Sequence, residues 1–526
     1  MLRSTFLGFK TATSALTVSQ NQMDIVGQNI SNVNTKGYTR QRVDINSVSF
    51  RTNNLKYGLT GVVIGQGVEA TGVSQYRDSF LDLRYRTESS KVGSQEVQLS
   101  TLSDLEAVFD EITTDGLDAQ FSDLLEQLHS LTSSPSDPVL EGVVRTSAEM
   151  LTQMFNNYSS QIQTIKDQQQ TYLKDGAIEK VNQLLDNIAE LNSQIKADNI
   201  SGNPALELND KRNMLIDELS SYLDIETEVV PLDIGAGRKI DELVIKLKLS
   251  DNSMVNIVDR DKYAEFSSEL DGTSDDVKVE LAKNIDDDYT NTNLTDLIDK
   301  GQIGGYIKFI NGKGDFTDKT DVDSQTKGIQ YYQKMLDTVA NKFATEMNEL
   351  NISTNADGTI TGYLFAARND SGTDDYTGFT AKNLKISDNW ADSTNSYIKN
   401  TTVITSGDNT GATDNILRMI AKFQEKMDFA TGGNPTDKVL FKGSFQEFLS
   451  FTTTRLNLQV SDVETSYETY SETQFQIEYS RNSLSSVDLN EEGVNLLTYS
   501  KSYNAAARLM TTIDEMLDTL INQMAR

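Results

Sequence analysis

The sequence predicts a mainly α-helical protein with β insertions, and three observations support this fold class. Apolar residues recur at steps of three and four at both ends of the chain and between Arg86 and Tyr222. Short alternating runs rich in Val, Ile and Leu, with glycine-containing loops, interrupt this pattern near Val43 and again after Glu226. With 526 residues, the chain is long enough for about three to four domains of ordinary size.

The charge and composition of the chain exclude several classes of function. There are 47 Lys and Arg residues against 78 Asp and Glu residues, which gives a formal net charge of −31. Such a surface repels phosphate backbones and anionic headgroups, so we expect no nucleic-acid partner. Cysteine is absent and His129 is the one histidine, so thiol nucleophiles, disulfides and multi-histidine metal sites are excluded. We expect no catalytic residues, no cofactor and no metal.

The chain carries no sequence signal for a membrane. No apolar run approaches the ~20 residues that span a bilayer, so we expect no membrane insertion. The first ten residues lack the apolar core of a cleaved signal peptide, which indicates that the general secretory route is not used. Absence of cysteine nonetheless suits a protein that functions outside the cell, where free thiols cross-link neighbours.

At the N-terminus a heptad stripe predicts the first helix. Its apolar members follow steps of three and four, with Thr13, Gln20 and Gly27 between them. A helix with so narrow a stripe is marginal in water and needs a partner, so we expect it to order on assembly. The candidate interface residues on this helix are Leu2, Phe6, Phe9, Leu16, Met23 and Ile30.

Next along the chain, the sequence predicts a small β segment over 43–76 and then a long helical bundle. Val43 to Phe50, Val62 to Ile64 and Val68 to Val73 have the composition of short strands, and the glycines at 65–67 fit a hairpin better than a phosphate loop. The helical pattern from Arg86 to Tyr222 breaks at Pro135, Pro138 and the turn 202–204, which favours antiparallel helices.

In the centre of the chain, the sequence pattern predicts domains inserted into the helical bundle. Strand patterns at Val229–Val230, Leu243–Leu249, Val255–Val258, Val277–Leu281 and Tyr306–Ile310 indicate a β-rich domain. A helix is expected from Tyr331 to Leu350, and a polar stretch that includes Trp390 indicates a small outer insertion; helices resume from Asp414 to Arg481. The predicted domains are 1–34 with 486–526, 35–225 with 319–351 and 411–485, 226–318, and 352–410.

The C-terminal segment carries the clearest heptad stripe in the sequence. Asn490, Glu491 and Glu492 supply capping and dipole-complementing groups at its start. Because both ends of the chain have such stripes, they can pair with each other or with other copies of the chain. The candidate interface residues here are Leu496, Tyr499, Tyr503, Ala506, Met510, Ile513, Leu517, Leu520 and Met524.

The sequence gives little support for a catalytic or metal-binding site. No pair among the many carboxylates is singled out by an apolar or aromatic setting, so a solvated acidic surface is favoured over a glycosidase pair. Asp315, Asp318, Asp321 and Asp323 cluster without a complete set of calcium ligands, as does 355–358. His129 lies in an apolar helical pattern, which favours a packed or capping role.

Two segments resemble a known family. Ser31–Val43 (SNVNTKGYTRQRV) resembles the N-terminal signature of the bacterial flagellar rod, hook and hook-associated axial proteins, and its TRQ ending resembles the hook-associated protein 1 branch. Lys36 stands where that family often has proline. Val487–Glu492 (VDLNEE) resembles the C-terminal signature, with Asp488 and Asn490 exchanged. The signature turn consists of Asn32, Asn34, Thr35, Gly37, Tyr38, Arg40 and Gln41.

The middle of the chain resembles the same branch over 133–230, including LNDKRNML at Leu208–Leu215. Asp210 and Arg212 lie too close in sequence to face each other on a helix. We expect them to have a structural role, such as tying the turn to a neighbouring helix.

The resemblance implies a structural adaptor that forms the junction between flagellar hook and filament. It further implies self-assembly into an axial homo-oligomer, contacts with the hook protein and with the second hook-associated protein on the filament side, and location outside the cell. Export would use the flagellar type III apparatus, with a cytosolic chaperone on the C-terminal helix. An apolar stripe that lacks a partner before assembly is a natural chaperone target.

Three alternatives stay open at this point. A hook or rod protein is the nearest, although these usually lack the long helical bundle. A flagellum-displayed hydrolase would use the β insertion as its catalytic domain. A cytosolic coiled-coil scaffold unrelated to flagella would share the heptad stripes.

Overall fold

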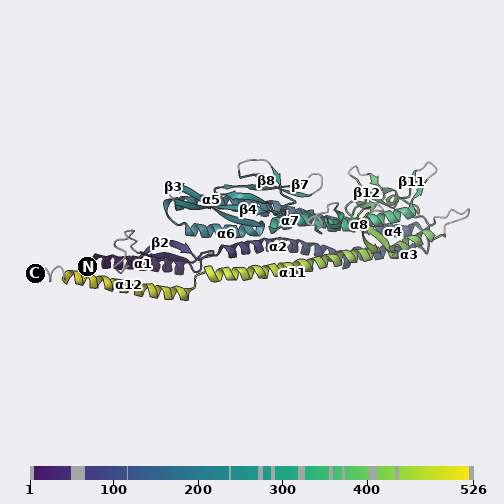
Figure 1. The fold of residues 1–526 in the computed structure, drawn as a ribbon. Coiled ribbons are helices and arrows are strands. Elements are labelled where there is room, and N and C mark those ends of the chain that lie inside the picture. The colour runs from purple at the N-terminus through teal and green to yellow at the C-terminus, as the bar shows by residue number, and fades with distance from the viewer. Residues whose placement is uncertain are drawn as a thin grey trace.

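The computed structural model is an elongated molecule with both chain ends at the same tip (Figure 1). A long helical rod leads from this tip to a helical bundle at the far end, and a β-rich body lies along one side of the rod (Figure 1). The residues that the structure describes are 5–48, 65–114, 116–235, 238–270, 276–285, 291–317, 326–354, 359–369, 373–401, 411–432 and 437–519.

At the tip, the first and last helices run antiparallel. These are α1 (Thr5–Ser31) and α12 (Leu489–Asp518). The carboxylate of the N-cap residue Asp488 accepts hydrogen bonds from the backbone N–H groups of Asn490 and Glu491, so the exchanged signature still caps α12. Beside α1 lies the antiparallel hairpin of β1 (Gln41–Ser47) and β2 (Val68–Gln75). The predicted strand at 62–64 lies outside the described residues.

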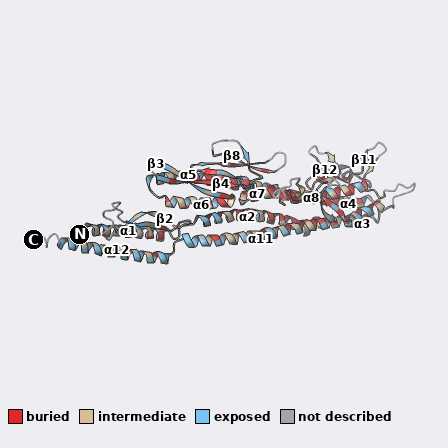
Figure 2. Cartoon of the chain, in the orientation of Figure 1, coloured by how far each residue is buried: buried red, intermediate tan, exposed pale blue. Residues whose placement is uncertain are grey.

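The rod consists of α2 (Ser79–Thr114) and α11 (Phe445–Ser485), which pack along each other. A capping box starts α11, because the Ser444 hydroxyl accepts from the Glu447 N–H and the Glu447 carboxylate accepts from the Ser444 N–H. Most of α11 beyond the bundle is exposed on the side away from α2 (Figure 2).

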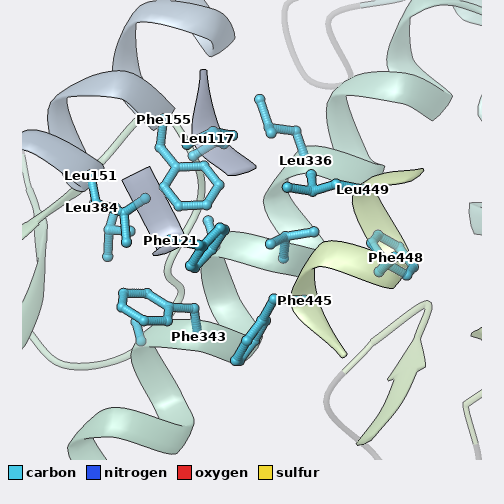
Figure 3. Close-up of a cluster of buried hydrophobic side chains, with 14 of the residues drawn as sticks. Leu117, Phe121, Leu151, Phe155, Leu336, Phe343, Leu384, Phe445, Phe448 and Leu449 are labelled. Atoms are coloured by element: carbon cyan, nitrogen blue, oxygen red, sulfur yellow. The ribbon is translucent and has the colours of Figure 1, made fainter. Parts of the chain in front are cut away.

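The bundle at the far end has an aromatic core. It combines the ends of α2 and α11 with α3 (Leu117–Leu131), α4 (Pro138–Thr171), α8 (Ile329–Asn351) and α10 (Asp414–Gln424). The Phe121 ring stacks on Phe445 at 5.6 Å and meets Phe343 and Phe155 edge-on at 5.4 and 6.0 Å (Figure 3). Such contacts between rings contribute beyond the burial of their area.

One long helical segment links the bundle to the β-rich body. From α4 the chain continues through a π-helical segment, η1 (Tyr172–Ile178), into α5 (Glu179–Ser201). Gly202, with φ +88°, ends α5 in the left-handed conformation that glycine adopts at little cost, and α6 (Leu206–Tyr222) returns. The helical breaks at Pro138 and 202–204 are therefore as predicted.

The β-rich body contains two antiparallel sheets, of order β3-β4-β5-β6 and β7-β8-β9, packed on η1, α5, α6 and α7 (Gly301–Asn311). Four of the five predicted strands are present. The bounds are β3 (Ile225–Gly235), β4 (Arg238–Lys248), β5 (Met254–Asp259), β6 (Lys262–Tyr263), β7 (Glu265–Leu270), β8 (Val277–Lys283) and β9 (Thr292–Asn293).

The prediction of a strand at Tyr306–Ile310 is wrong, because this segment lies in helix α7 (Gly301–Asn311). A short apolar run fits a buried strand and a buried helix equally well. The glycines decide between them: a Cβ on Gly305 would lie 2.8 Å from the backbone oxygen of Ser94 in α2. The helix can approach α2 closely because Gly305 has no side chain.

The polar stretch after α8 folds against the bundle. Its largest sheet has the order β13-β12-β14, and Trp390 in the short helix α9 is buried below it. A hairpin that the sequence analysis did not predict precedes α11. The bounds are β10 (Ser353–Thr354), β11 (Ile360–Thr361), β12 (Phe365–Arg368), β13 (Asp374–Asp375), β14 (Leu384–Ile386), α9 (Asp388–Ala391), β15 (Met427–Ala430) and β16 (Val439–Gly443); the turn η2 (Gly314–Phe316) precedes α8.

Replacing Asp337 by asparagine should stabilise the protein at neutral pH. Burial in α8 raises the pKa of Asp337 to about 6, although its carboxylate accepts a hydrogen bond of 2.8 Å from the Ala381 N–H. Because this pKa is higher in the folded than in the unfolded protein, folding favours the protonated carboxyl of Asp337. The free energy of unfolding is therefore highest below about pH 4, and this contribution is lost as the pH rises through 6. Asparagine keeps an acceptor without the charge, and should gain about 2–3 kcal/mol at pH 7.5.

Urea unfolding at pH 7.5 and pH 4 measures this effect. The gain from Asp337→Asn should shrink towards zero at the lower pH. Glu349→Gln on the exposed side of α8 is the control and should change little at either pH. An equal effect of Asp337→Asn at both pH values would contradict the assignment.

Candidate functional site

The predicted apolar stripe of α12 faces α1. Ala506 is buried, whereas Tyr499, Met510, Ile513 and Leu517 are half-buried. A Cβ on Gly8 of α1 would lie 3.1 Å from the Ile513 side chain, so the two helices are close near the tip. Leu496 and Tyr503, at the edge of the stripe, remain exposed. Two helices alone therefore bury the stripe only in part.

On α1 the buried side is displaced from the predicted stripe. Ala12, Val18 and Val26 are buried, while the predicted residues Leu16, Met23 and Ile30 are half-buried and Phe9 is exposed. The residues that face α12 and the hairpin are thus small or β-branched, and the larger predicted residues lie at the border of the contact. Leu2, Leu520, Met524 and the Phe6 side chain lie outside the described residues.

The signature turn connects α1 to β1. Thr35 donates from its hydroxyl to Asn32 Oδ1 at 3.2 Å, and its backbone N–H donates to the Asn32 oxygen at 2.9 Å. Gly37 has φ +80°, and a Cβ there would lie 2.1 Å from Sδ of Met214 in α6. The positive φ favours glycine at this position, and any larger side chain would also have to displace the flexible end of Met214. Asn34 and Lys36 are exposed at the end of the turn.

The buried amide of Asn29 holds the turn against both ends of the chain. Its Nδ2 donates to the Gln41 backbone oxygen at 2.9 Å and to Oε2 of Glu492 at 3.2 Å. Its Oδ1 accepts from the Tyr38 hydroxyl at 2.9 Å and from the Gln41 N–H at 3.0 Å. Burial, together with the nearby carboxylates of Glu207, Asp210 and Glu492, raises the pKa of Tyr38 to about 12, so its hydroxyl stays protonated and can donate.

Arg40 binds the first turn of α12. Its Nε donates to Oε1 of Glu492 at 2.8 Å and its second nitrogen donates to Glu491 at 2.8 Å. The Glu492 carboxylate is 1% exposed, so this ion pair lies inside the protein. Burial alone would lower the pKa of Arg40, but Glu491 and Glu492 raise it above its ordinary value. The N–H of Arg40 also donates to the Ser485 oxygen at the end of α11.

Asp210 ties the same turn to the middle of the chain. The Thr39 hydroxyl and backbone N–H donate to its carboxylate at 2.7 and 3.0 Å, and Gln75 Nε2 donates at 3.0 Å. Burial raises the pKa of Asp210 despite these hydrogen bonds. Arg212 donates to Asn192 of α5 at 2.8 Å. Asp210 thus ties the signature turn to α6, and Arg212 ties α6 to the neighbouring helix α5, which agrees with the structural role expected for both.

A second ionic cluster lies where α2, α6 and α11 meet. The Arg481 guanidinium donates to Asp217 at 2.6 Å and lies over the Tyr85 ring at 4.1 Å. Asp217 also accepts from Arg86 at 2.8 Å. A cavity of about 810 Å³ opens beside this cluster, lined by the signature turn, α2, α6 and α11.

The polar groups at this site join segments that lie far apart in the sequence. Polar groups at the site bind one another: Asn29, Arg40, Glu492 and Asp210 all have hydrogen-bond partners within the protein. Within the described ranges, no group of three or more His, Asp or Glu side chains is placed to hold a metal ion. Asp315, one of the acidic residues considered for calcium, pairs instead with Lys438 and Arg455. None of the helices in the described residues combines the length and apolar character needed to cross a bilayer.

Two residues of the site were not predicted from the sequence. Asn29 lies three residues after the buried Val26, so it faces inwards, and a polar residue on a buried side was the available signal. Glu207 accepts a hydrogen bond from Gln41 Nε2 at 3.3 Å, and no signal in the sequence marked it. His129 is exposed rather than packed, but it lies in the last turn of α3, where its backbone oxygen accepts from the C-cap residue Thr132, so of the two expected roles only packing is wrong.

Family models match three segments of the chain. The model described as the flagellar hook-associated protein FlgK helical domain matches residues 102–365. The model of the flagellar basal body rod FlgEFG protein C-terminal matches 481–524, and that of the flagella basal body rod protein matches 9–39. The two shorter matches contain nearly all of α1 and the whole of α12, with most of the signature residues.

Individual proteins are similar over different lengths. Flagellar hook-associated protein 1 of Bacillus subtilis is 28% identical over 537 residues, which cover 99% of each chain. The protein of the same name from Escherichia coli is 29% identical over 225 residues, or 41% of this chain and 39% of that one. The solved structure of the flagellar hook junction protein FlgK from Burkholderia pseudomallei has a TM-score of 0.53 at 12% identity, covering 76% of this chain and all of that one.

Proposed function

The chain belongs to the family of the flagellar hook-associated protein FlgK, and on this premise we propose that it assembles through α1 and α12 into the junction between hook and filament. It is a structural protein of the bacterial flagellum. The self-assembly surface is the terminal pair of helices, α1 and α12. We propose no catalytic activity for the β-rich body.

One observation carries this proposal: buried contacts join both chain ends and the middle of the chain at a single place. Arg40 binds Glu492 of α12, and the adjacent Thr39 binds Asp210 of α6. A load or displacement at the terminal helices therefore reaches α6 and the β-rich body packed on it through paired, buried groups. Such rigid coupling suits a subunit whose ends form a tube while its body lies outside.

The half-buried stripe supports assembly with further copies. Met510, Ile513 and Leu517 face α1 yet remain partly exposed. Burying the rest of such side chains contributes about 25 cal/mol for each Å² removed from water. Neighbouring copies in a tube would cover the area that α1 leaves open.

The surface formed by α1 and α12 also suggests the other binding partners of the protein. We propose contacts with the hook protein on one side and with the second hook-associated protein on the filament side. Before assembly, α12 with its partly exposed stripe is the segment that a cytosolic export chaperone would cover. Export through the flagellar type III apparatus would place the protein outside the cell at the hook–filament junction.

Replacing Met510 by aspartate tests the proposal. A carboxylate at this half-buried position must be desolvated against α1 and any neighbouring copy, so incorporation into flagella should be lost. The bundle should keep its unfolding midpoint, because α12, which carries Met510, lies at the opposite end of the molecule from the bundle (Figure 1). The readouts are swarming, and the amount of protein in isolated hook–filament particles, in cells that carry only the variant.

Thr511→Asp is the matched control. This variant places the same negative charge one residue further along, on the exposed side of α12, and the protein should assemble normally. Normal swarming with Met510→Asp would overturn the proposed interface. Equal loss with both variants would show that charge anywhere on α12 is harmful and that the stripe has no special role.

A further inference from the structure

Two small apolar patches stay exposed on the rod, outside the terminal helices. One lies on α11, where Phe475 and Tyr479 are 59% and 67% exposed. The other lies on α2, where Phe80 and Leu83 are 62% and 40% exposed. Large aromatic side chains left this open on a structural subunit indicate a surface that is covered by something else.

The α11 patch points away from α2. Ile477 is buried on the side of α11 that packs in the rod. Phe475 and Tyr479 each lie two residues from Ile477, which places them about 160° around the helix from it. They are one turn apart, so their rings share one face.

The α2 patch lies on a different flank of the rod. Arg86 faces α6, where it binds Asp217, and Asp82 faces α11, where it lies 3.5 Å from Arg481. Phe80 lies about 120° around α2 from Arg86 and about 160° from Asp82, so it belongs to neither contact. Arg84 follows one turn later, with its guanidinium 5.8 Å from the Phe80 ring centre.

Both patches lie at the same height along the rod. The helices run antiparallel, and Asp82 of α2 meets Arg481 of α11. Leu83 is one residue from Asp82, and Tyr479 is two residues from Arg481. The near ends of the two patches, Leu83 and Tyr479, are therefore level along the rod, and the patches differ mainly in their position around its axis.

Their charges are complementary. Between Arg455 and Arg481 the α11 sequence has no Lys or Arg, and Glu468 and Glu472 lie on the face that carries Phe475 and Tyr479. The α2 flank adds the cation of Arg84. An acidic apolar patch on one flank and a basic apolar patch on another can join two copies that stand side by side.

We propose that the Phe475–Tyr479 face of one copy packs against the Phe80–Leu83 flank of a second copy of this chain. Two different patches make a heterologous contact, which repeats around a ring or helical tube, whereas a self-complementary patch would close a dimer. The inference rests on the proposed function and adds to it a lateral contact outside the terminal helices.

Engineered cysteines test the contact, since the natural chain contains none. Leu83→Cys and Tyr479→Cys are made in separate chains and expressed together in cells without the natural copy. Hook–filament particles are isolated, oxidised and denatured. We expect cross-linked dimers from the mixture and none from particles that contain either variant alone.

The control pairs Leu83→Cys with Leu458→Cys, an exposed position on α11 about 30 Å further along the helix, and should give no dimers. Dimers from Tyr479→Cys alone, cross-links to a different flagellar protein, or intact particles without cross-links would overturn the lateral contact. The last of these leaves the proposed function standing, because the protein would still be in the particles.

A charge exchange covers the case in which the cysteine chains do not assemble. Arg84→Glu should lower incorporation into particles at least several-fold, because it replaces the cation of the α2 flank by a charge of the same sign as Glu472 and Glu468 on the neighbour's face. Adding Glu472→Arg in the same chain should restore it. Normal incorporation of Arg84→Glu, or no recovery in the double variant, would overturn the contact.

Discussion

Arg40→Ala should release the start of α12 from the signature turn and destabilise the paired chain ends by about 3–5 kcal/mol. The variant leaves the Glu492 carboxylate, which is 1% exposed, with the Asn29 amide at 3.2 Å and without its cation. A buried charge that loses its partner costs far more than a surface pair. Assembly should fail as a consequence, because α12 no longer holds its place beside α1.

Hydrogen exchange of the native protein measures this effect. Amides of α12 and β1 should exchange faster in Arg40→Ala, while those of the bundle should keep their protection. Arg42→Ala, two residues further along in β1, is the control, since Arg42 is exposed and pairs with Asp44 at the surface; exchange of α12 and β1 should stay as in the natural chain.

A second variant separates the charge from the packing. If the unpaired carboxylate causes the loss, Arg40→Ala combined with Glu492→Gln should recover part of the stability. Equal protection of α12 in Arg40→Ala and in the natural chain would contradict the role assigned to this ion pair.

The sequence was most informative where a pattern was both long and regular. The stripe from Tyr499 to Leu517 on α12 faces α1 as its spacing indicated, and Pro138 and Gly202 mark real helix ends. On α1 the prediction was less accurate, because large residues such as Phe9 outlined the stripe whereas small ones, such as Ala12, form the buried side. Apolar size is a poor guide where two helices approach closely.

Short segments were less predictable for a physical reason. The run Tyr306–Ile310 has too few residues for its period to separate strand from helix, and contact with α2 decides its conformation. The hairpin before α11 was missed for the same reason, since β15 has four residues. Long-range packing, which no local pattern records, determines such elements.

At the candidate site, the sequence predicted some of the residues but not the contacts between them. The family signature predicted that Arg40 and Gln41 are important, and the capping pattern did the same for Glu492. The contact between Arg40 and Glu492 was not predicted, because it joins residues more than 400 positions apart. Family resemblance located these segments, and the matches at 9–39 and 481–524 agree with it. Nothing in the local sequence indicated that Asn29 and Asp210 would bind the same turn.

Glu141→Ala should unfold the outer segment around Trp390 and lower the stability of the bundle by about 3–5 kcal/mol. The Glu141 carboxylate in the first turn of α4 is buried. It accepts from Trp390 Nε1 at 3.1 Å, from the Ser396 hydroxyl at 2.7 Å and from the N–H groups of Tyr397 and Ile398 at 2.9 and 3.1 Å. Alanine would leave all four donors without this acceptor; Ser396 is exposed and its hydroxyl can bind water, whereas the buried Trp390 Nε1 and Ile398 N–H would each cost about 1–3 kcal/mol.

Fluorescence reports directly on this contact, because Trp390 is the one tryptophan in the chain and is 1% exposed. In Glu141→Ala its emission should shift to the red as the indole meets water, and the urea midpoint of the bundle should fall. Glu149→Ala, on the exposed side of the same helix, should change neither. A Glu141→Ala protein with unchanged emission and midpoint would mean that apolar packing around Trp390, such as its edge contact of 5.9 Å with Phe365, holds the segment without the carboxylate.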